Sequence, residues 1–298
     1  MTARPAILRR SLLFVPASDE RKVERARAAS ADTVLLDLED AVAPDTKDGA
    51  RRTVAEALRA RAFGATEVAV RVNAPGSPWF EDDVAAVAAT GGRTILLPKA
   101  ETAEGVAAVA ARLRGLPGLA PPEGFRLLLL VETPLGIASA LALARAAPEV
   151  DALCFGHADF CLEMGLRVAD AASGVAFHAR CALAIAARAA GVAAIDCVHL
   201  AVKDETGFRA DAERGRDLGF DGKLCIHPRQ AEIANEVYTP ARDAIERALR
   251  VVQAAERAAA AGRGVFELDG RMVDAPVVAL ERRVLERARR AGVLGDAP

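Results

Sequence analysis

Short apolar runs alternate with Ala/Arg/Glu-rich stretches along most of the chain. Eight of these runs are apolar at nearly every position, as expected for strands of a parallel sheet that is covered by helices on both faces. They predict strands at Arg10–Val15, Thr33–Leu38, Glu67–Val72, Arg93–Leu97, Arg126–Val131, Asp151–Phe155, Ala193–Cys197 and Lys223–Ile226.

The intervening stretches predict helices at 19–30, 47–61, 78–90, 101–114, 134–147, 175–190, 207–218 and 228–237. Thr133 before Pro134 and Ser77 before Pro78 each place a hydroxyl ahead of a proline, which is typical of a capped helix start. Eight strand–helix repeats predict an α/β fold, a closed (β/α)8 TIM barrel. The alternative, an open doubly wound sheet, normally has a G-x-G-x-x-G loop after its first strand, and 15–18 reads Val-Pro-Ala-Ser instead.

The chain after the eighth repeat does not continue the alternation. It predicts a helix at 240–261, a break at Gly262–Gly264, a short apolar stretch at Val265–Leu268 and a last helix at 276–292. We therefore expect a barrel domain over 1–240 and a C-terminal helical extension over 241–298. The extension could be a clasp on its own barrel, a cap, or an arm that reaches a neighbouring subunit.

Composition and charge narrow the class of protein. The 298 residues carry 39 Lys+Arg and 41 Asp+Glu, a net charge of −2, so no nucleic-acid partner is expected. With 68 alanines and 4% aromatic residues, the core must consist mainly of small aliphatic side chains. Apolar runs fall short of the ~20 residues that span a bilayer, and the run after Arg9-Arg10 ends at Pro16, too early for an export signal. Because no apolar run is long enough, no membrane partner is expected. Five cysteines without C-x-x-C spacing predict reduced, buried thiols in a cytoplasmic protein.

Ionic residues stand at the predicted strand ends, where a barrel of this kind forms its active site. Carboxylates that converge there repel one another unless a cation lies between them. Glu132 and Asp159, at adjacent strand ends, are the best pair of hard oxygen ligands, and they favour Mg²⁺, or Mn²⁺, over Zn²⁺. Alternatively, they form structural ion pairs with Arg71 or Lys99. The ionic strand-end residues are Asp37, Glu39, Asp40, Arg71, Lys99, Glu132, Asp159, Asp196 and His227.

Basic residues at the strand ends suggest how an anionic substrate is held. Arg71 offers a planar fork to a carboxylate, although a salt bridge to Glu39 or Asp40 is an alternative that is compatible with that role. Lys99, one of only five lysines, raises the alternative of a Schiff-base aldolase. His227 could contact substrate or simply begin a helix.

Motifs distributed in order along the chain resemble the citrate lyase beta-subunit-like and malyl-CoA lyase family of the HpcH/HpaI aldolase superfamily. The resemblance covers nearly the whole chain. Its motifs are SLLFVP (11–16), LDLEDAV (36–42), VRVN (70–73), PK (98–99), VETP (131–134), FGHAD (155–159), GK (222–223), IHP (226–228) and GRMVD (270–274).

This resemblance implies a metal-dependent barrel and a role for individual residues. Glu132 and Asp159 would bind Mg²⁺, with Glu132 also at the substrate, and Arg71 would hold the carboxylate of an α-keto acid. Asp274 would be the catalytic acid/base, delivered by the C-terminal arm, in related enzymes from the adjacent subunit of a trimer. Phe14 and Arg25 would contact coenzyme A, Ile226 and His227 the acyl-CoA, and Glu39, Asp40 and Lys99 would support the site.

The implied activity is Mg²⁺-dependent carbon–carbon bond cleavage, or formation, of a 3-hydroxyacyl-CoA such as citramalyl-, malyl- or citryl-CoA. Its products would be an α-keto acid and acetyl-CoA. The alternatives are a malyl-CoA-type thioesterase and a citrate lyase beta subunit that acts only with an acyl-carrier partner. The segment between Asp159 and residue 175 is shorter than in malyl-CoA lyases, which favours the citrate-lyase-like branch. A homotrimer or a dimer of trimers is expected.

Overall fold

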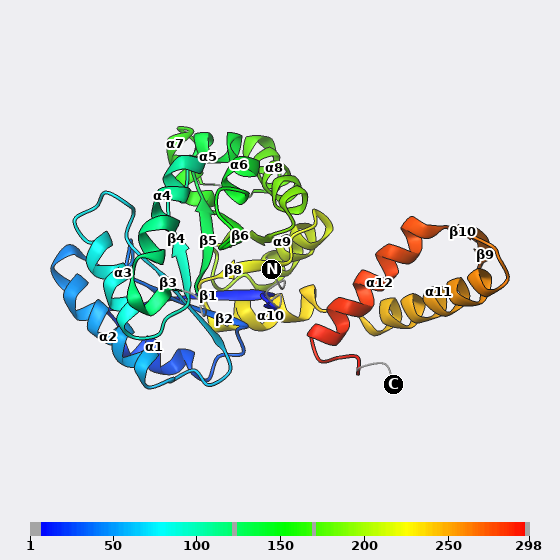
Figure 1. Ribbon diagram of the computed structural model, residues 1–298, viewed down its shortest axis with the longest axis horizontal. Coiled ribbons are helices and arrows are strands. Elements are labelled where there is room, and N and C mark those ends of the chain that lie inside the picture. Colours follow the sequence, from blue (N-terminus) through cyan, green and yellow to red (C-terminus); the bar gives the residue numbers. More distant parts are fainter. Residues whose placement is uncertain (1–6, 121–123, 169–170, 296–298) are drawn as a thin grey trace. The chain divides into compact units, whose positions relative to one another are not determined.

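The computed structural model describes residues 7–120, 124–168 and 171–295. The chain separates into two compact units, of which one runs from Arg9 to Tyr238. The other contains the described residues on either side of this range, 7–8 and 239–295. Figure 1 shows both units, each of which is described below by itself.

Eight parallel strands close into a barrel in the order β1 to β8, with β8 pairing back to β1. The predicted (β/α)8 TIM barrel is confirmed, and each predicted strand lies within one residue of the observed bounds. The strands are β1 (Ser11–Pro16), β2 (Thr33–Asp37), β3 (Glu67–Arg71), β4 (Thr94–Leu97), β5 (Arg126–Val131), β6 (Val150–Phe155), β7 (Ala193–Asp196) and β8 (Gly222–Cys225).

Helices surround this sheet (Figure 1). Short 3-10 helices also occur at Pro44–Thr46 and Pro117–Leu119. The α-helices of the barrel unit are α1 (Glu20–Ala26), α2 (Lys47–Arg59), α3 (Phe80–Ala89), α4 (Ala103–Arg114), α5 (Pro134–Ala138), α6 (Ala140–Ala144), α7 (His157–Glu163), α8 (Gly174–Ala190), α9 (Glu205–Asp217) and α10 (Pro228–Tyr238).

One of the two helix starts that were predicted from a hydroxyl followed by proline is present. Thr133 caps α5, because its hydroxyl accepts a hydrogen bond from Gly136 N at 3.0 Å and Pro134 takes the first helical position. The prediction for Ser77 is wrong, since α3 begins at Phe80 after a turn. Acidic residues at 81–83 form the first turn of α3, where negative charge is most favourable.

Two apolar layers stabilise the barrel. The strand side chains that face inward form the interior layer, and those that face outward pack against the helices in a larger cluster. At the N-terminal end of the barrel, Arg9 is 4% exposed and bridges Glu67 and Asp151. The interior layer consists of Leu12, Leu35, Ala69, Leu96, Leu128, Leu130, Ala152, Cys154, Ile195 and Leu224.

The second unit is a helical hairpin, α11 (Arg242–Ala260) and α12 (Ala275–Arg290), with a two-stranded ribbon between the helices. The ribbon strands are β9 (Phe266–Leu268) and β10 (Arg271–Val273). They join through Asp269 and Gly270, both at positive φ, as a tight two-residue hairpin requires. The predicted helices are present, but β10 was not anticipated.

Candidate active site

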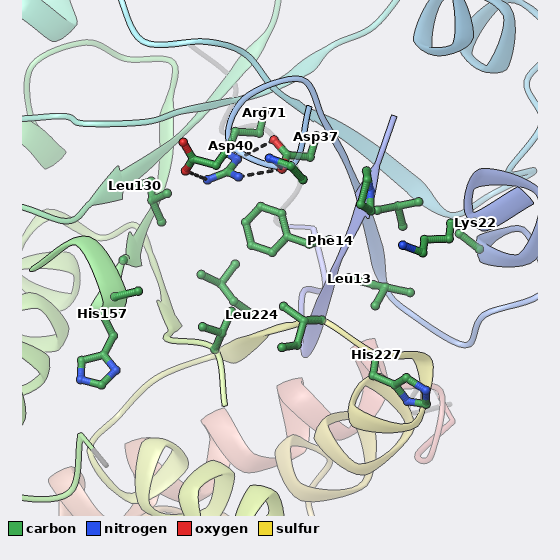
Figure 2. Close-up of a pocket in the computed structure, with 18 of the residues that line it drawn as sticks. Leu13, Phe14, Lys22, Asp37, Asp40, Arg71, Leu130, His157, Leu224 and His227 are labelled. Atoms are coloured by element: carbon green, nitrogen blue, oxygen red, sulfur yellow. Dashed lines mark hydrogen bonds and ion pairs between the residues drawn. The ribbon is translucent and has the colours of Figure 1, made fainter. Parts of the chain in front are cut away.

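A cavity of about 810 Å³ is lined by residues at the C-terminal ends of the strands and in the loops that follow them. Apolar side chains such as Leu13, Leu130 and Leu224 form much of its wall, and Arg71 lies beside the ring of Phe14 (Figure 2). Predicted site residues that line it are Phe14, Arg25, Asp40, Arg71, Glu132, Asp159, Ile226 and His227.

The Arg71 guanidinium is fixed from three sides. Its Nε and Nη2 each donate to Asp37 at 2.7 Å, because the parallel register places Asp37 directly beside Arg71 at the ends of β2 and β3. Its Nη1 lies 3.3 Å from Asp40 Oδ2, and its Cζ lies 5.0 Å from the centre of the Phe14 ring. These contacts, several of which Figure 2 shows, hold a permanently charged group in one orientation at the wall of the cavity.

Glu39 is a buried carboxylate with incomplete hydrogen bonding. Its Oε2 lies 3.0 Å from Arg71 Nη1 but without hydrogen-bond geometry, and its Oε1 lies 3.8 Å from Lys99 Nζ. Burial raises the pKa of Glu39 to about 7, against the opposing effect of the Arg71 charge. The predicted ion pairs of Arg71 with Glu39 and Asp40 are therefore both present.

Glu132 projects from the loop after β5 and is 1% exposed. Its Oε1 accepts a hydrogen bond from the backbone N–H of Lys99 at 2.8 Å, and Lys99 adopts a φ of 53° that is unusual for a residue with a side chain. A Cβ on Gly156 would lie 2.3 Å from Glu132 Cβ, so only glycine fits at that position. Burial raises the pKa of Glu132 to about 8, and the nearby Asp159 charge acts in the same direction.

These features fit a divalent cation. Glu132 and Asp159 line one wall of the cavity, and Glu39 offers a buried oxygen without a hydrogen-bond donor. A cation would remove the electrostatic cost of placing these carboxylates together in a partly dry site. Oxygen donors without cysteine or histidine are the set that Mg²⁺ and Mn²⁺ prefer. The assignment of Glu132 and Asp159 as ligands stays a prediction.

The pH dependence of stability tests the raised pKa of Glu132 and its assignment as a metal ligand. Its folded-state pKa of about 8 lies above the ordinary 4.5, so the stabilising protonated form is lost as the pH rises through about 8. We expect the melting temperature of EDTA-treated protein to fall between about pH 6 and pH 8.5, because each pKa unit is worth about 1.4 kcal/mol. Thermal denaturation should show a smaller fall for Glu132→Gln, which retains an oxygen for Lys99 N–H.

Added Mg²⁺ should raise the melting temperature of the wild type more at the higher pH, because the cation competes with the Glu132 proton. The Glu132→Gln variant should gain less from Mg²⁺ at both pH values. An equal gain from Mg²⁺ in the wild type and the variant would contradict the assignment of Glu132 as a ligand.

Basic residues line a second side of the cavity. Lys22 and His227 lie away from the Arg71 end in Figure 2, and Arg25 also contributes to the lining. His227 both lines the cavity and begins a helix, since its Nδ1 accepts a hydrogen bond from Arg229 N at 3.2 Å. The two interpretations of His227 are thus compatible. His157 also lines the cavity, and burial lowers its pKa, which favours the neutral imidazole.

Asp196 does not belong to this group of strand-end acids, contrary to the sequence prediction. It is fully buried in a closed ion cluster with Arg180 and Lys223, in which Lys223 Nζ lies 3.0 Å from Asp196 and 2.7 Å from Asp211. Asp196, Cys197 and Asp211 have the spacing of a metal site, but the two buried cations already neutralise the carboxylates. We interpret this cluster as structural.

Asp274 lies in the second compact unit, where it caps α12. Its Oδ1 accepts a hydrogen bond from Val277 N at 3.2 Å, and Pro276 follows in the first turn. The role of Asp274 as an acid/base stays a prediction.

The sequence reasoning missed two contributions to the site. Asp37 was noticed as a strand-end acid but not as the residue that orients Arg71. Lys99 was considered for its ammonium, yet its backbone N–H makes the contact with Glu132. Strand register could have indicated the first, whereas the second depends on a backbone conformation without a sequence signal.

Within residues 7–120, 124–168 and 171–295, no helix combines the length and the apolar character that a bilayer crossing needs.

Comparison with known proteins gives relatives over nearly the whole chain. The family model described as HpcH/HpaI aldolase/citrate lyase matches residues 10–228. Citrate lyase subunit beta of Escherichia coli (strain K12) is 38% identical over 287 residues, which cover 96% of this chain and 95% of the relative. A (3S)-malyl-CoA thioesterase of Cereibacter sphaeroides is 39% identical over 287 residues, 96% of each chain.

A solved structure agrees with these relatives. The protein CitE of Mycobacterium tuberculosis, in complex with magnesium, acetoacetate and coenzyme A, matches with a TM-score of 0.76 and 34% identity. The match covers 94% of this chain and 97% of CitE. The family model spans most of the chain, and both relatives align over nearly its full length. The chain therefore belongs to the HpcH/HpaI aldolase/citrate lyase family.

Proposed function

We propose that the protein is a Mg²⁺-dependent carbon–carbon lyase that acts on a 3-hydroxyacyl-CoA. The observation that carries the proposal is the pairing, in one cavity, of the oriented Arg71 guanidinium with the carboxylates Glu132 and Asp159. An α-keto acid needs both a cationic partner for its carboxylate and a stabilising charge at its keto oxygen. The magnesium and the acetoacetate bound to CitE are consistent with these two needs, and its coenzyme A is consistent with a thioester substrate.

The residues divide the work of the proposed reaction. Cleavage converts the substrate carbinol into a keto group: the hydroxyl proton leaves to solvent, and the electrons of the broken carbon–carbon bond move into a thioester enolate. Arg71 binds and orients the carboxylate of the departing keto acid. Glu132 and Asp159 would hold a divalent cation, which when bound supplies Lewis acidity for the negative charge that develops on the keto-side oxygen. Asp274 would protonate the enolate carbon, and in the reverse direction it would remove the α-proton.

The thioester end would lie along the basic and apolar side of the cavity. Phe14 and Arg25 would contact coenzyme A, and Ile226 and His227 the acyl-CoA substrate; all four line the cavity. Gln230 supports this side, because it accepts a hydrogen bond from Ile226 N at 2.9 Å and donates one to His199 O at 3.0 Å. It thus ties the loop after β8 to the loop after β7.

The two relatives suggest two alternative functions for this chain. A (3S)-malyl-CoA thioesterase is as similar to this chain as citrate lyase subunit beta is, which favours thioester hydrolysis as the second candidate. Citrate lyase subunit beta is itself named as a subunit, so action together with an acyl-carrier partner is the third candidate function. For the assembly we propose a homotrimer or a dimer of trimers, in which the extension over 241–298 brings Asp274 to a barrel, and for the location the cytoplasm.

A substrate screen tests the function. Purified protein is incubated with malyl-, citramalyl- or citryl-CoA and Mg²⁺, and the products are identified by mass spectrometry. The proposal predicts equal amounts of an α-keto acid and acetyl-CoA. Free coenzyme A with the intact hydroxy acid would instead identify a thioesterase. If none of the three is consumed until a small acyl-carrier protein is supplied, the chain is a lyase subunit.

A further inference from the structure

A buried lysine lies behind the strand ends that carry the keto-acid side of the cavity. Lys47, the first residue of α2, is 4% exposed. Its ammonium donates to Leu38 O at 2.6 Å, to Glu39 O at 2.7 Å and to Asn73 Oδ1 at 2.7 Å. These three acceptors use all three protons of the ammonium group, and each acceptor is an uncharged oxygen.

Asn73 completes the connection on the other side. Its side-chain amide donates to Leu38 O at 2.9 Å and to Asp83 Oδ2 at 2.6 Å, and its backbone N–H donates to the same Asp83 oxygen at 2.9 Å. Asp83, on α3, is fully buried. The loop after β2 and the loop after β3 are therefore joined to each other and anchored to α2 and α3.

The two joined segments carry two side chains that meet beside the cavity: Glu39 lies in the loop after β2, and Arg71 is the last residue of β3 and lines the cavity. Glu39 follows Leu38 directly, and Arg71 precedes Asn73 by two residues. The side chains of Glu39 and Arg71 meet with Oε2 and Nη1 3.0 Å apart. Any shift of the Leu38–Glu39 backbone against β3 would change this spacing.

The contacts of Lys47 are not those that stability alone would favour. Taking an ammonium out of water is costly, and the shift of the Lys47 pKa below its usual value, caused first by burial, reflects that cost. The Trp79 ring, 5.0 Å from Nζ, contributes a cation–π contact that offsets part of it. An apolar side chain could fill the same volume but could not hold two successive carbonyls of a loop.

We propose that Lys47 is a positioning residue of the keto-acid subsite, where it fixes the Leu38–Glu39 backbone against Asn73 and so sets the spacing of Glu39 and Arg71. The inference rests on the proposed function, because it gives Lys47 a role at the site where the keto acid of that reaction would bind. Lys47 does not touch the substrate and acts only through the residues that it holds.

The test compares binding of the two halves of the substrate. Full-length wild type, Lys47→Met, Lys47→Arg and the exposed control Lys203→Met are titrated by calorimetry in Mg²⁺ with pyruvate and, separately, with coenzyme A. We expect Lys47→Met to weaken pyruvate binding at least ~10-fold, which corresponds to about 1.4 kcal/mol. Coenzyme A binding should stay within about twofold of the wild type, because no contact of Lys47 reaches that side.

Conservative and independent variants separate positioning from general damage. Lys47→Arg should retain more pyruvate affinity than Lys47→Met, and Lys203→Met should match the wild type. If Lys47→Met does not fold, Asn73→Ser removes the same connection from its other end and should show the same selective loss. Unchanged pyruvate binding, or an equal loss of both ligands, in the folded variants would overturn the inference. Failure of the wild type itself to bind pyruvate or another α-keto acid would instead count against the proposed function, and the inference would fall with it.

Discussion

Replacing Asp274 with Asn should reduce the rate of carbon–carbon cleavage by about 10²–10⁴-fold, the usual contribution of a general acid or base. The amide cannot deliver a proton to the enolate carbon, yet it preserves the shape of the side chain. Asn is also a good N-cap, so the hydrogen bond from Val277 N and the start of α12 should persist. Steady-state kinetics on the thioester substrate, with keto acid as the measured product, give the result.

Matched variants distinguish chemistry from folding in this experiment. Asp274→Ala should be equally inactive but less stable by about 1 kcal/mol, because it removes the helix cap. Asp269→Asn, in the ribbon turn of the same unit, changes an exposed carboxylate at positive φ and should be fully active. Mg²⁺ binding should be unchanged in all three. An Asp274→Asn protein with wild-type turnover would remove Asp274 from the mechanism.

Replacing Arg71 with Lys should have the next largest effect. Lysine keeps the charge but cannot serve Asp37 through two parallel hydrogen bonds while presenting a further N–H to the cavity. Charged hydrogen bonds are worth about 1.5–3 kcal/mol each, so we expect kcat/KM to fall by about 10²–10³-fold. Pyruvate affinity, measured by calorimetry, should fall in parallel, whereas coenzyme A affinity should not.

The control for Arg71→Lys is the same substitution at an exposed pair. Arg112 is about half-exposed and bridges Glu81 on the outside of the barrel, so Arg112→Lys should leave activity and binding unchanged. Thermal denaturation must show that Arg71→Lys is folded, since Asp37 loses part of its buried partner. Retention of wild-type kcat/KM and pyruvate affinity by Arg71→Lys would show that Arg71 serves only the ion pairs with Asp37, Glu39 and Asp40.

The fold could be predicted from the sequence because its pattern is strong at every repeat. Strands that are buried on both faces have uninterrupted apolar sequences, whereas the helices between them have polar faces. The predicted strand bounds therefore agree with the observed bounds within one residue. Local features with weaker signals were predicted less well. The predicted helix at 134–147 is interrupted at Ser139, and α7 directly after Gly156 was not anticipated. Such details depend on packing that no short motif encodes.

Part of the site could be predicted from the rule that the C-terminal ends of the strands meet at one end of the barrel. This rule brought Arg71, Glu132 and Asp159 to one cavity, as the structure shows. It was wrong for Asp196, because sequence position does not reveal which side of the sheet a strand-end side chain faces or whether buried cations already neutralise it. It also could not identify Lys47, which lies outside the strands and acts through backbone carbonyls.

The central claim is that a divalent cation and the carboxylate of an α-keto acid occupy one composite site formed by Glu132, Asp159 and Arg71. Calorimetric titration of pyruvate into the wild-type protein, once with Mg²⁺ and once after treatment with EDTA, tests it most directly. We predict saturable binding with Mg²⁺ and at least ~10-fold weaker binding without it, a difference of about 1.4 kcal/mol or more. Equal affinity in the two titrations would show that metal and keto acid do not share a site and would contradict the claim.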